Sequence, residues 1–267
     1  MLKLRKAIRR TGPALSGTAV EYPLRRFKPV HFFSDRFVSS GEISIFKSAL
    51  ELVLEKADVK GVLPIEIFGN WHKDAKEFGS IEWYIKQAYD ARRRQCDLLK
   101  LLDLFKKEPW QRELPHYDVL LLSSYDLYDS AVPEIKFLTG RGSINAAVIS
   151  FFRFRKQGEE ALKQAGIHEF GHTFGALPHC EKLCSMRSPE FIPSDLMIHS
   201  RDRIKRGALC EYCESKIKQT FWEPPAYYQQ IPEVLEILDR LAAREPEILE
   251  KVKSGEVAQV EVTIDWI

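Results

Sequence analysis

The chain has 267 residues, of which 45% are hydrophobic, so it is long enough to bury a full core in one compact domain. Its 40 basic and 38 acidic residues give a net charge of +2, which indicates neither a nucleic acid nor a strongly acidic partner. It contains no run of about 18 apolar residues, and we therefore expect no membrane span.

The first 30 residues are basic and rich in turn-forming residues. Five basic residues stand among the first ten, and no acidic residue precedes Glu21. An Arg-rich start that lacks acidic residues is typical of a transit peptide, but also of an exposed basic terminus, which is the interpretation that we prefer. We predict an irregular segment over residues 1–30.

The next elements are predicted from the spacing of apolar residues. Helical spacing predicts a helix over residues 42–57. Residues 62–68 form a short apolar run that ends at the turn signal Gly69-Asn70, and this favours a strand. Residues 80–105 fit one long helix. Its core-facing side is expected to contain Trp83, Tyr84, Ala88, Ala91 and Leu98.

Three strands and one further helix are predicted in the middle of the chain. Residues 118–123 and 145–154 have the composition of buried strands, and residues 134–138 that of a shorter strand. A helix that opens at residues 158–160 follows them. Helices that alternate with strands predict an α/β fold, with a sheet and helices packed against it.

The last third of the chain is predicted to be richer in loops. Turn residues favour a loop-rich lobe over residues 180–214, and two helices are expected around residues 231–243 and 245–254. Residues 257–264 alternate between apolar and polar side chains, which favours a strand near the end of the chain. The predicted organisation is a basic segment (residues 1–30), a main domain (residues 31–220) and a C-terminal helical extension packed on that domain (residues 221–267).

The most informative segment lies on the helix that opens near residue 158. His168 and His172 are four residues apart, so their imidazoles project from the same side of a helix. Two such nitrogens can bind one tetrahedral zinc ion, and His179 follows closely enough to be a third ligand. Glu169 is placed beside the metal-bound water rather than on the metal. A helix with two incidental histidines is the alternative interpretation.

This pattern predicts hydrolytic chemistry. Three neutral imidazoles leave zinc with its full charge and one open position, and the pKa of water bound there falls to about 7. We expect Glu169 to accept a proton from that water as general base and to pass it to the leaving amine. Gly175 is expected to take the left-handed conformation that ends the helix and lets His179 return to the metal.

Four of the five cysteines form two close pairs, Cys180 with Cys184 and Cys210 with Cys213. In a chain without the apolar core of a secretory signal, this spacing indicates metal binding in a reducing compartment, so we expect a cytoplasmic location. Disulfide pairing is the alternative. Cys96 is expected to be an inert core residue.

Residues 168–213 resemble the archaemetzincins, a family of zinc metallopeptidases in the metzincin clan. The family motif is HExxHxxG, then a His-Cys pair, a second Cys that is followed after one residue by Met, and finally CxxC. Upstream, Asp126-Leu127-Tyr128 and Arg153 are also similar to family residues. The motif is matched by His168, Glu169, His172, Gly175, His179, Cys180, Cys184, Met186, Cys210 and Cys213.

The resemblance implies a metzincin-like mixed sheet with packed helices and two zinc ions per chain. The three histidines would hold a catalytic zinc, the four cysteines a structural zinc, and Met186 would lie in a turn beneath the catalytic ion. An antiparallel edge strand, expected near residues 135–138, would bind the substrate as an added strand. The implied activity is hydrolysis of a peptide or protein substrate, by an endopeptidase or an aminopeptidase-type enzyme.

The spacing departs from the family pattern by one residue in two places. Three residues (176–178) precede the third histidine where the family has two, and three separate Cys180 from Cys184 where the family has four. A one-residue shift of the His-Cys pair explains both differences and satisfies both metals, so we prefer it. In the unshifted register, Pro178 replaces the third histidine and His179 joins three cysteines at the structural ion.

Other interpretations remain open at this stage. A metzincin-fold zinc protein with weak or no activity, acting as a binding or regulatory module, is one alternative; the intact Glu169 favours the peptidase. A zinc-ribbon-like interaction module is another, although no cluster of basic and aromatic residues indicates nucleic acid. The sequence does not predict the oligomeric state. Further candidates by residue type are His199 or Glu190 as a third ligand and Tyr227 or Tyr228 as oxyanion donors. Asp202 resembles an acid that stands between the metal motifs in the family, which implies a hydrogen bond to a ligand.

Overall fold

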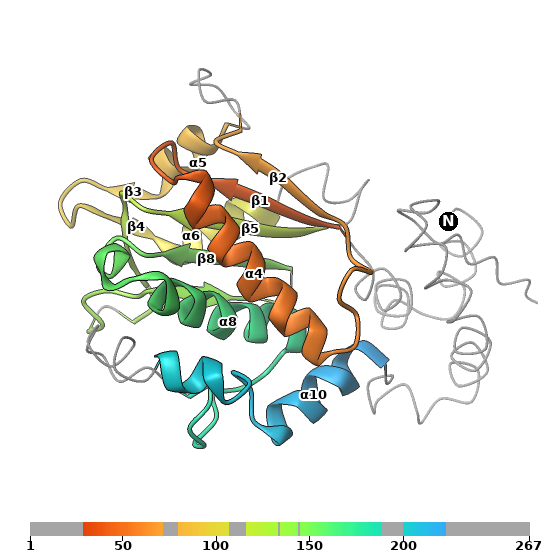
Figure 1. The fold of residues 1–267 in the computed structure, drawn as a ribbon. Coiled ribbons are helices and arrows are strands. Elements are labelled where there is room, and N and C mark those ends of the chain that lie inside the picture. The colour runs from red at the N-terminus through yellow and green to blue at the C-terminus, as the bar shows by residue number, and fades with distance from the viewer. Residues whose placement is uncertain are drawn as a thin grey trace, which may run out of the picture.

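The computed structural model describes residues 29–71, 80–106, 116–132, 134–143, 145–187 and 200–222. These residues form a mixed α/β fold with two sheets and with helices on both faces of the larger sheet (Figure 1). The strands are β1 (Val30–Ser34), β2 (Ile65–Gly69), β3 (Tyr89–Asp90), β4 (Gln95–Asp97), β5 (Tyr117–Leu122), β6 (Asp126–Tyr128), β7 (Gly140–Gly142) and β8 (Ala146–Ser150). The helices are α4 (Ser40–Lys56), α5 (Ile81–Ala88), α6 (Leu98–Lys106), α8 (Glu159–Gly175), α10 (Glu211–Trp222) and the 3-10 helix η1 (Arg155–Gln157).

The larger sheet has five strands in the order β2-β1-β5-β8-β7. Its first four strands are parallel, whereas β7 pairs antiparallel with β8 and forms the edge beside α8. A parallel strand needs a crossover connection, and α4 supplies the first one between β1 and β2. A smaller sheet has the order β3-β4-β6.

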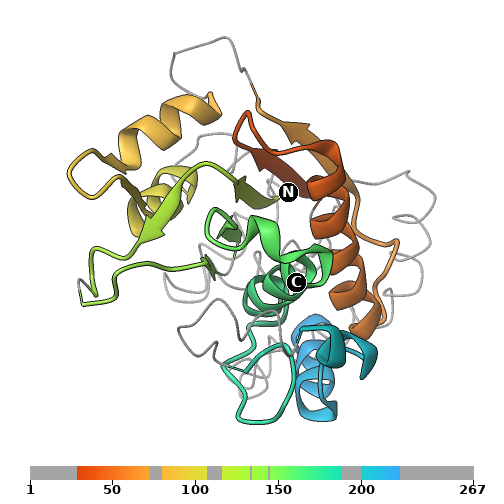
Figure 2. The same cartoon turned by 60° about the vertical axis from the view of Figure 1, so that its left-hand side comes forward.

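Helices α4 and α8 cover one face of the larger sheet, as Figures 1 and 2 show. Helix α4 begins with a capping box, in which the Ser39 hydroxyl accepts the Glu42 N–H and the Glu42 carboxylate accepts the Ser39 N–H. The two helices approach closely at Gly166, where a Cβ would stand 2.9 Å from Ala49 Cβ. Tight packing here fixes α8 against the rest of the core.

A second apolar core lies on the opposite face of the larger sheet. It joins Phe33, Leu120 and Val148 from the sheet with residues of α5, β4 and α6, among them Tyr84 and Phe105. Successive side chains of a strand point to opposite faces, and both faces are covered here, which explains why β5 is buried at all six positions. No helix in the described part of the chain is both long and apolar enough to cross a membrane.

Several predicted elements are confirmed. The helix over residues 42–57, the strands over residues 62–68, 118–123 and 145–154, and the helix opening near residue 158 all form, with ends shifted by a few residues. The strand β1 was not predicted. The C-terminal helices, the late strand and nearly all of the basic N-terminal segment lie outside the described residues.

The prediction of one long helix over residues 80–105 is wrong. The chain leaves the helix at Tyr89, forms the β3-β4 hairpin, and starts α6 after Asp97, whose carboxylate accepts the Leu99 N–H. Arg94 adopts a positive φ of 56° in the hairpin turn, which no helix tolerates. Periodicity missed the break because neither glycine nor proline marks it. Ala91 is therefore exposed and Trp83 only partly buried.

Candidate metal centre

Helix α8 carries two imidazoles on the side that faces the segment that follows the helix. The Nε2 atoms of His168 and His172 lie 3.2 Å apart. Each ring is fixed through its other nitrogen: His168 Nδ1 donates to the Ser185 carbonyl at 2.8 Å, and His172 Nδ1 donates to the Leu177 carbonyl at 2.6 Å. Carbonyl oxygens only accept, so both protons are on Nδ1 and both Nε2 lone pairs face each other.

This arrangement fits a bound cation. Two nitrogens on one tetrahedral zinc ion, with bonds of about 2.0–2.1 Å, are separated by about 3.3 Å. Burial, and to a smaller extent His172, lowers the pKa of His168 to about 3; burial also lowers the pKa of His172. Both rings are therefore neutral at physiological pH, which is the form that binds metal. Facing lone pairs repel each other until a cation lies between them.

The end of α8 differs from the prediction. The left-handed residue is Ala176, with φ 47° and ψ 31°, and not Gly175. Glycine is needed at 175 for packing, because a Cβ there would lie 2.7 Å from Ile217 Cγ1 of α10. Ala176 therefore takes the strained conformation that the sequence analysis assigned to the glycine.

The chain after this turn brings the third imidazole back to the helix. The His179 ring centroid lies 5.2 Å from that of His168 and 5.0 Å from that of His172. One nitrogen from each ring falls within a group no more than 4.8 Å across. His179 is exposed, whereas His168 is buried, so the group opens toward solvent on the side of His179. His179 thus lies with the imidazoles, as in the shifted register.

Glu169 points from α8 toward the edge strand β7. It is 5% exposed, and burial raises the pKa of its carboxyl to about 8, opposed by the Gly142 N–H and the Arg141 charge. A Cβ at Gly140 would stand 3.0 Å from Glu169 Oε1, so glycine leaves room for the carboxylate. A divalent cation nearby would favour the ionised form that a general base requires.

The four paired cysteines form a second group. Cys180 Sγ lies 3.8 Å from Cys210 Sγ, and Cys184 Sγ lies 3.9 Å from Cys213 Sγ. All four are free thiols, and one sulfur from each lies within the same small group. Four sulfurs on one zinc ion, with bonds of about 2.3 Å, are separated by about 3.8 Å. The donor set therefore fits a closed tetrahedral metal site.

A three-residue segment, Cys184-Ser185-Met186, connects the thiols to the imidazoles. The Met186 carbonyl accepts the Cys180 N–H at 2.9 Å, and the next carbonyl upstream, that of Ser185, accepts the His168 ring proton. Met186 is fully buried under α8, where a Cβ on Gly171 would clash with its sulfur. The position of one imidazole therefore depends on the segment that the thiols hold.

Gln164 supports the same carbonyl and was missed by the sequence analysis. Its amide donates to the Ser185 carbonyl at 3.2 Å and accepts from the Ser185 hydroxyl at 2.9 Å, and its side chain is buried. Gln164 precedes His168 by one helical turn, so the spacing alone placed it on the same side of α8. Fixing this carbonyl fixes the tautomer and orientation of His168.

We predict that Gln164→Ala weakens zinc binding at the imidazole group by about 10- to 100-fold, the usual cost of losing a partner of a metal-ligating histidine. Competition with a chromogenic chelator measures the affinity. The control is Gln157→Ala in η1, which should leave the zinc affinity unchanged. Equal affinities for the two variants would contradict the role of Gln164.

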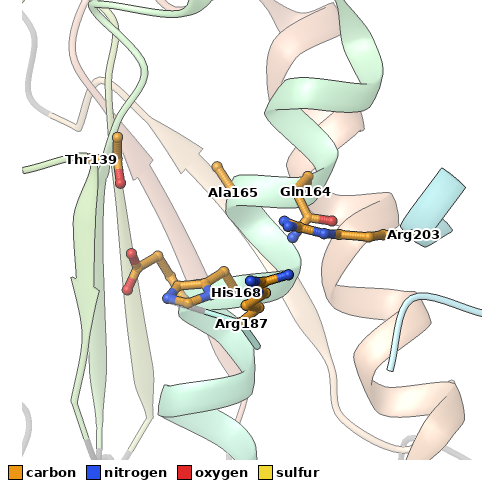
Figure 3. A pocket seen from close by; sticks show the side chains of 7 residues that line it. Thr139, Gln164, Ala165, His168, Arg187 and Arg203 are labelled. Carbon is orange, nitrogen blue, oxygen red and sulfur yellow. The ribbon is translucent and has the colours of Figure 1, made fainter. Parts of the chain in front are cut away.

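A pocket opens beside His168 and Glu169 (Figure 3). Two arginines face it, Arg187 directly after Met186 and Arg203 from a helical segment over residues 200–205. Arg203 is only 7% exposed, although it lies in a run of basic residues over 201–206. The pocket is lined by Thr139, Gln164, Ala165, His168, Glu169, Arg187 and Arg203.

The remaining sequence candidates are distributed as follows. Arg153 donates to both carboxylate oxygens of Asp126, which joins these two upstream residues in one ion pair. Cys96 is buried in β4, where burial raises the pKa of its thiol to about 12. Asp202 is exposed. The candidates His199, Glu190, Tyr227 and Tyr228 lie outside the described residues.

The edge strand is displaced from its predicted place. It runs over Gly140–Gly142, and the expected segment near residues 135–138 contributes only an isolated bridge between Leu138 and Leu127. A Cβ on Gly142 would overlap the backbone of Glu169 and the Thr173 hydroxyl. Only a strand with glycine at positions 140 and 142 comes this close to α8, so packing, and not hydrophobic alternation, determines which residues form it.

Comparison with known proteins gives one informative match. The crystal structure of archaemetzincin from Methanopyrus kandleri superposes with a TM-score of 0.54, covers 73% of this chain and 96% of its own, and is 21% identical in sequence. No protein-family model matches the sequence, and no curated protein matches it. The chain therefore has the mixed α/β, metzincin-like fold of that structure.

Proposed function

We propose that the chain is a zinc-dependent metallopeptidase, with His168, His172 and His179 as ligands of the catalytic ion and Glu169 as the general base. The observation that carries this proposal is the pair of Nε2 lone pairs that face each other at 3.2 Å, with both Nδ1 protons committed to backbone carbonyls. The archaemetzincin-like fold supports it. Zinc at this position supplies an activated water and polarises the scissile carbonyl.

The protein's own residues have distinct tasks in this proposal. The ring protons of His168 and His172 hold both imidazoles in the metal-binding tautomer. Glu169, held by the Gly142 N–H against the edge strand, accepts the proton of the attacking water and delivers it to the leaving amine. Its burial excludes bulk water from the carboxylate, which keeps the proton near the reacting atoms.

The edge strand supports a peptide or protein as substrate. Among the residues that the structure describes, β7 pairs only with β8, and it runs directly beside the helix that carries Glu169. A substrate in extended conformation can add to such a strand through main-chain hydrogen bonds, which align its peptide bonds with the site. Whether the enzyme cleaves inside a chain or at its amino end is decided by mapping products from a peptide library of varied length.

The four cysteines are proposed as ligands of a structural zinc ion. Four protein sulfurs leave no coordination position for a substrate, so this ion has no part in the chemistry. Two thiols, Cys184 and Cys213, have their pKa raised by burial, and a metal ion provides the charge that stabilises them as thiolates. The proposed content is two zinc ions per chain in these two sites.

An anomalous-scattering map at the zinc edge tests both sites together with the variant His179→Ala. In the wild type we expect one peak among the imidazoles and one among the sulfurs. Because His179 lies with the imidazoles, its loss should lower occupancy at that peak and leave the sulfur peak unchanged. Loss of the sulfur peak instead would support the unshifted register and overturn the assignment of His179.

A further inference from the structure

Another group of side chains lies at the amino-terminal ends of three parallel strands. His31 is in β1, Glu66 is in β2, Asp118 is in β5, and His116 directly precedes β5. His31 pairs in register with Glu66 on one side and with Asp118 on the other, so these three side chains form one row across neighbouring strands. His116 is two residues before Asp118 and shares its face.

This row is on the face of the sheet that α8 does not cover. Phe32 and Tyr117 belong to the core with α4 and α8, whereas Phe33 belongs to the core with α5 and α6. His31, two residues before Phe33, and Asp118, next to Tyr117, therefore point away from α8. The group is separated from the three imidazoles of the candidate catalytic site by the thickness of the sheet.

The four side chains contact one another. His116 Nε2 lies 3.1 Å from Asp118 Oδ1, and His31 Nε2 lies 3.4 Å from Glu66 Oε2. The two imidazoles stack with centroids 4.1 Å apart and an angle of 23°. One donor atom each from His31, His116 and Asp118 falls within 4.8 Å of the others. The donors that bind transition metals are thus already gathered.

Charge and burial favour a cation in this group. His116 and Asp118 are buried, at 2% and 3% exposure, and the aromatic rings of Phe33 and Phe68 border His31. Burial and the neighbouring His116 lower the pKa of His31 to about 4, so its ring is neutral. An ion pair of His116 with Asp118 explains one contact. It does not explain why a neutral imidazole and a second carboxylate complete the row.

We propose that His31, Glu66, His116 and Asp118 bind a divalent first-row transition ion, such as Zn²⁺, at a third metal site. Two imidazoles and two carboxylates match the ligand preference of such ions. Four protein ligands make the site a closed, structural one that ties the amino-terminal ends of β1, β2 and β5 together. Donors on one ion stand about 3.3 Å apart, so the accessible side chains of His31 and Glu66 must turn inward on binding.

The experiment counts zinc in the full chain and in variants of the accessible half of the site. Wild type, His31→Gln and Glu66→Gln are dialysed against the same micromolar free zinc, and bound zinc is measured by elemental analysis. We expect His31→Gln to bind one ion fewer than the wild type, and Glu66→Gln to bind that ion at least tenfold more weakly. The control is Glu55→Gln, an exposed carboxylate that pairs with Lys60 outside the row, which should bind as the wild type does.

Thermal unfolding provides the second measurement. Zinc that binds only the folded protein raises the melting temperature with concentration, and His31→Gln should reduce this increase while its far-UV spectrum stays native. Equal zinc content in wild type and His31→Gln would overturn the proposal and leave His116 and Asp118 as an ion pair. Peptide cleavage should be the same in both proteins, so a failure here is distinguishable from a failure of the proposed peptidase site.

Discussion

Replacement of Glu169 by Gln is expected to lower the rate of peptide hydrolysis by about two to four orders of magnitude, which is what a positioned general base contributes. Glutamine has nearly the same size and still accepts the Gly142 N–H, so the edge strand should keep its place against α8. It has no carboxylate to accept a proton from water. A fluorogenic peptide identified from a library provides the rate, measured as kcat/KM with zinc in excess.

Zinc content separates loss of the base from loss of the site. The variant should hold as much zinc as the wild type, because Glu169 is not within the group of metal-binding nitrogens. Glu159→Gln, in the exposed first turn of the same helix, is the matched control and should retain full activity. Undiminished turnover in Glu169→Gln would remove the carboxylate from the mechanism. Inactivity in the wild type against every peptide tested would instead favour a binding or regulatory module.

The sequence predicted best where local spacing and chemistry agree. His168 and His172 lie on one side of a helix because four residues nearly complete a turn, and no long-range contact is needed to bring them together. The strands at residues 118–123 and 145–154 were recognisable because both faces of a central parallel strand are buried, which produces an unbroken apolar run. The prediction of these elements depends only on residues that are close together in the sequence.

The sequence predicted poorly where a contact distant in the chain decides the conformation. The edge strand Gly140–Gly142 has no apolar side chain, and its place depends on the space that α8 leaves. The strand β1 was missed because its apolar run is short and interrupted by His31, whose partners are 35 and 87 positions away. Position 175 needs glycine because a Cβ there would clash with Ile217 of α10, a helix that the sequence analysis did not expect, and Ala176 takes the left-handed turn.

The two metal groups are coupled through three consecutive residues. Cys184 belongs to the thiol group, Ser185 accepts the His168 ring proton, and Met186 packs beneath α8 and accepts the Cys180 N–H. A zinc ion bound by the thiols, as proposed, would therefore hold the carbonyl that orients the proposed ligand His168. The proposed structural ion would then affect activity, although it would take no part in the chemistry.

Cys213→Ser is expected to remove one zinc ion and to cause the largest loss of stability among these variants. Cys213 lies in the first turn of α10, and a zinc ion among the four thiols would join this helix to the loop that carries Cys180 and Cys184. Structural zinc contributes about 10–16 kcal/mol to the folding of zinc-finger peptides, which is comparable to the stability of a whole domain. We therefore expect a decrease in melting temperature far beyond that of an ordinary packing defect. Elemental analysis and calorimetry measure the two effects.

The matched control for this variant is Cys96→Ala, at the one cysteine outside the group. Cys96 is fully buried in β4, so its truncation should cost about 1 kcal/mol of packing and leave the zinc content unchanged. Loss of the thiol site should also loosen Ser185 and weaken zinc at the imidazole group by about 10- to 100-fold, so that excess zinc restores part of the activity. If Cys213→Ser kept its zinc and melted like Cys96→Ala, the thiols would be ordinary core residues. The orientation of His168 would then depend on Gln164 and the packing of Met186 alone.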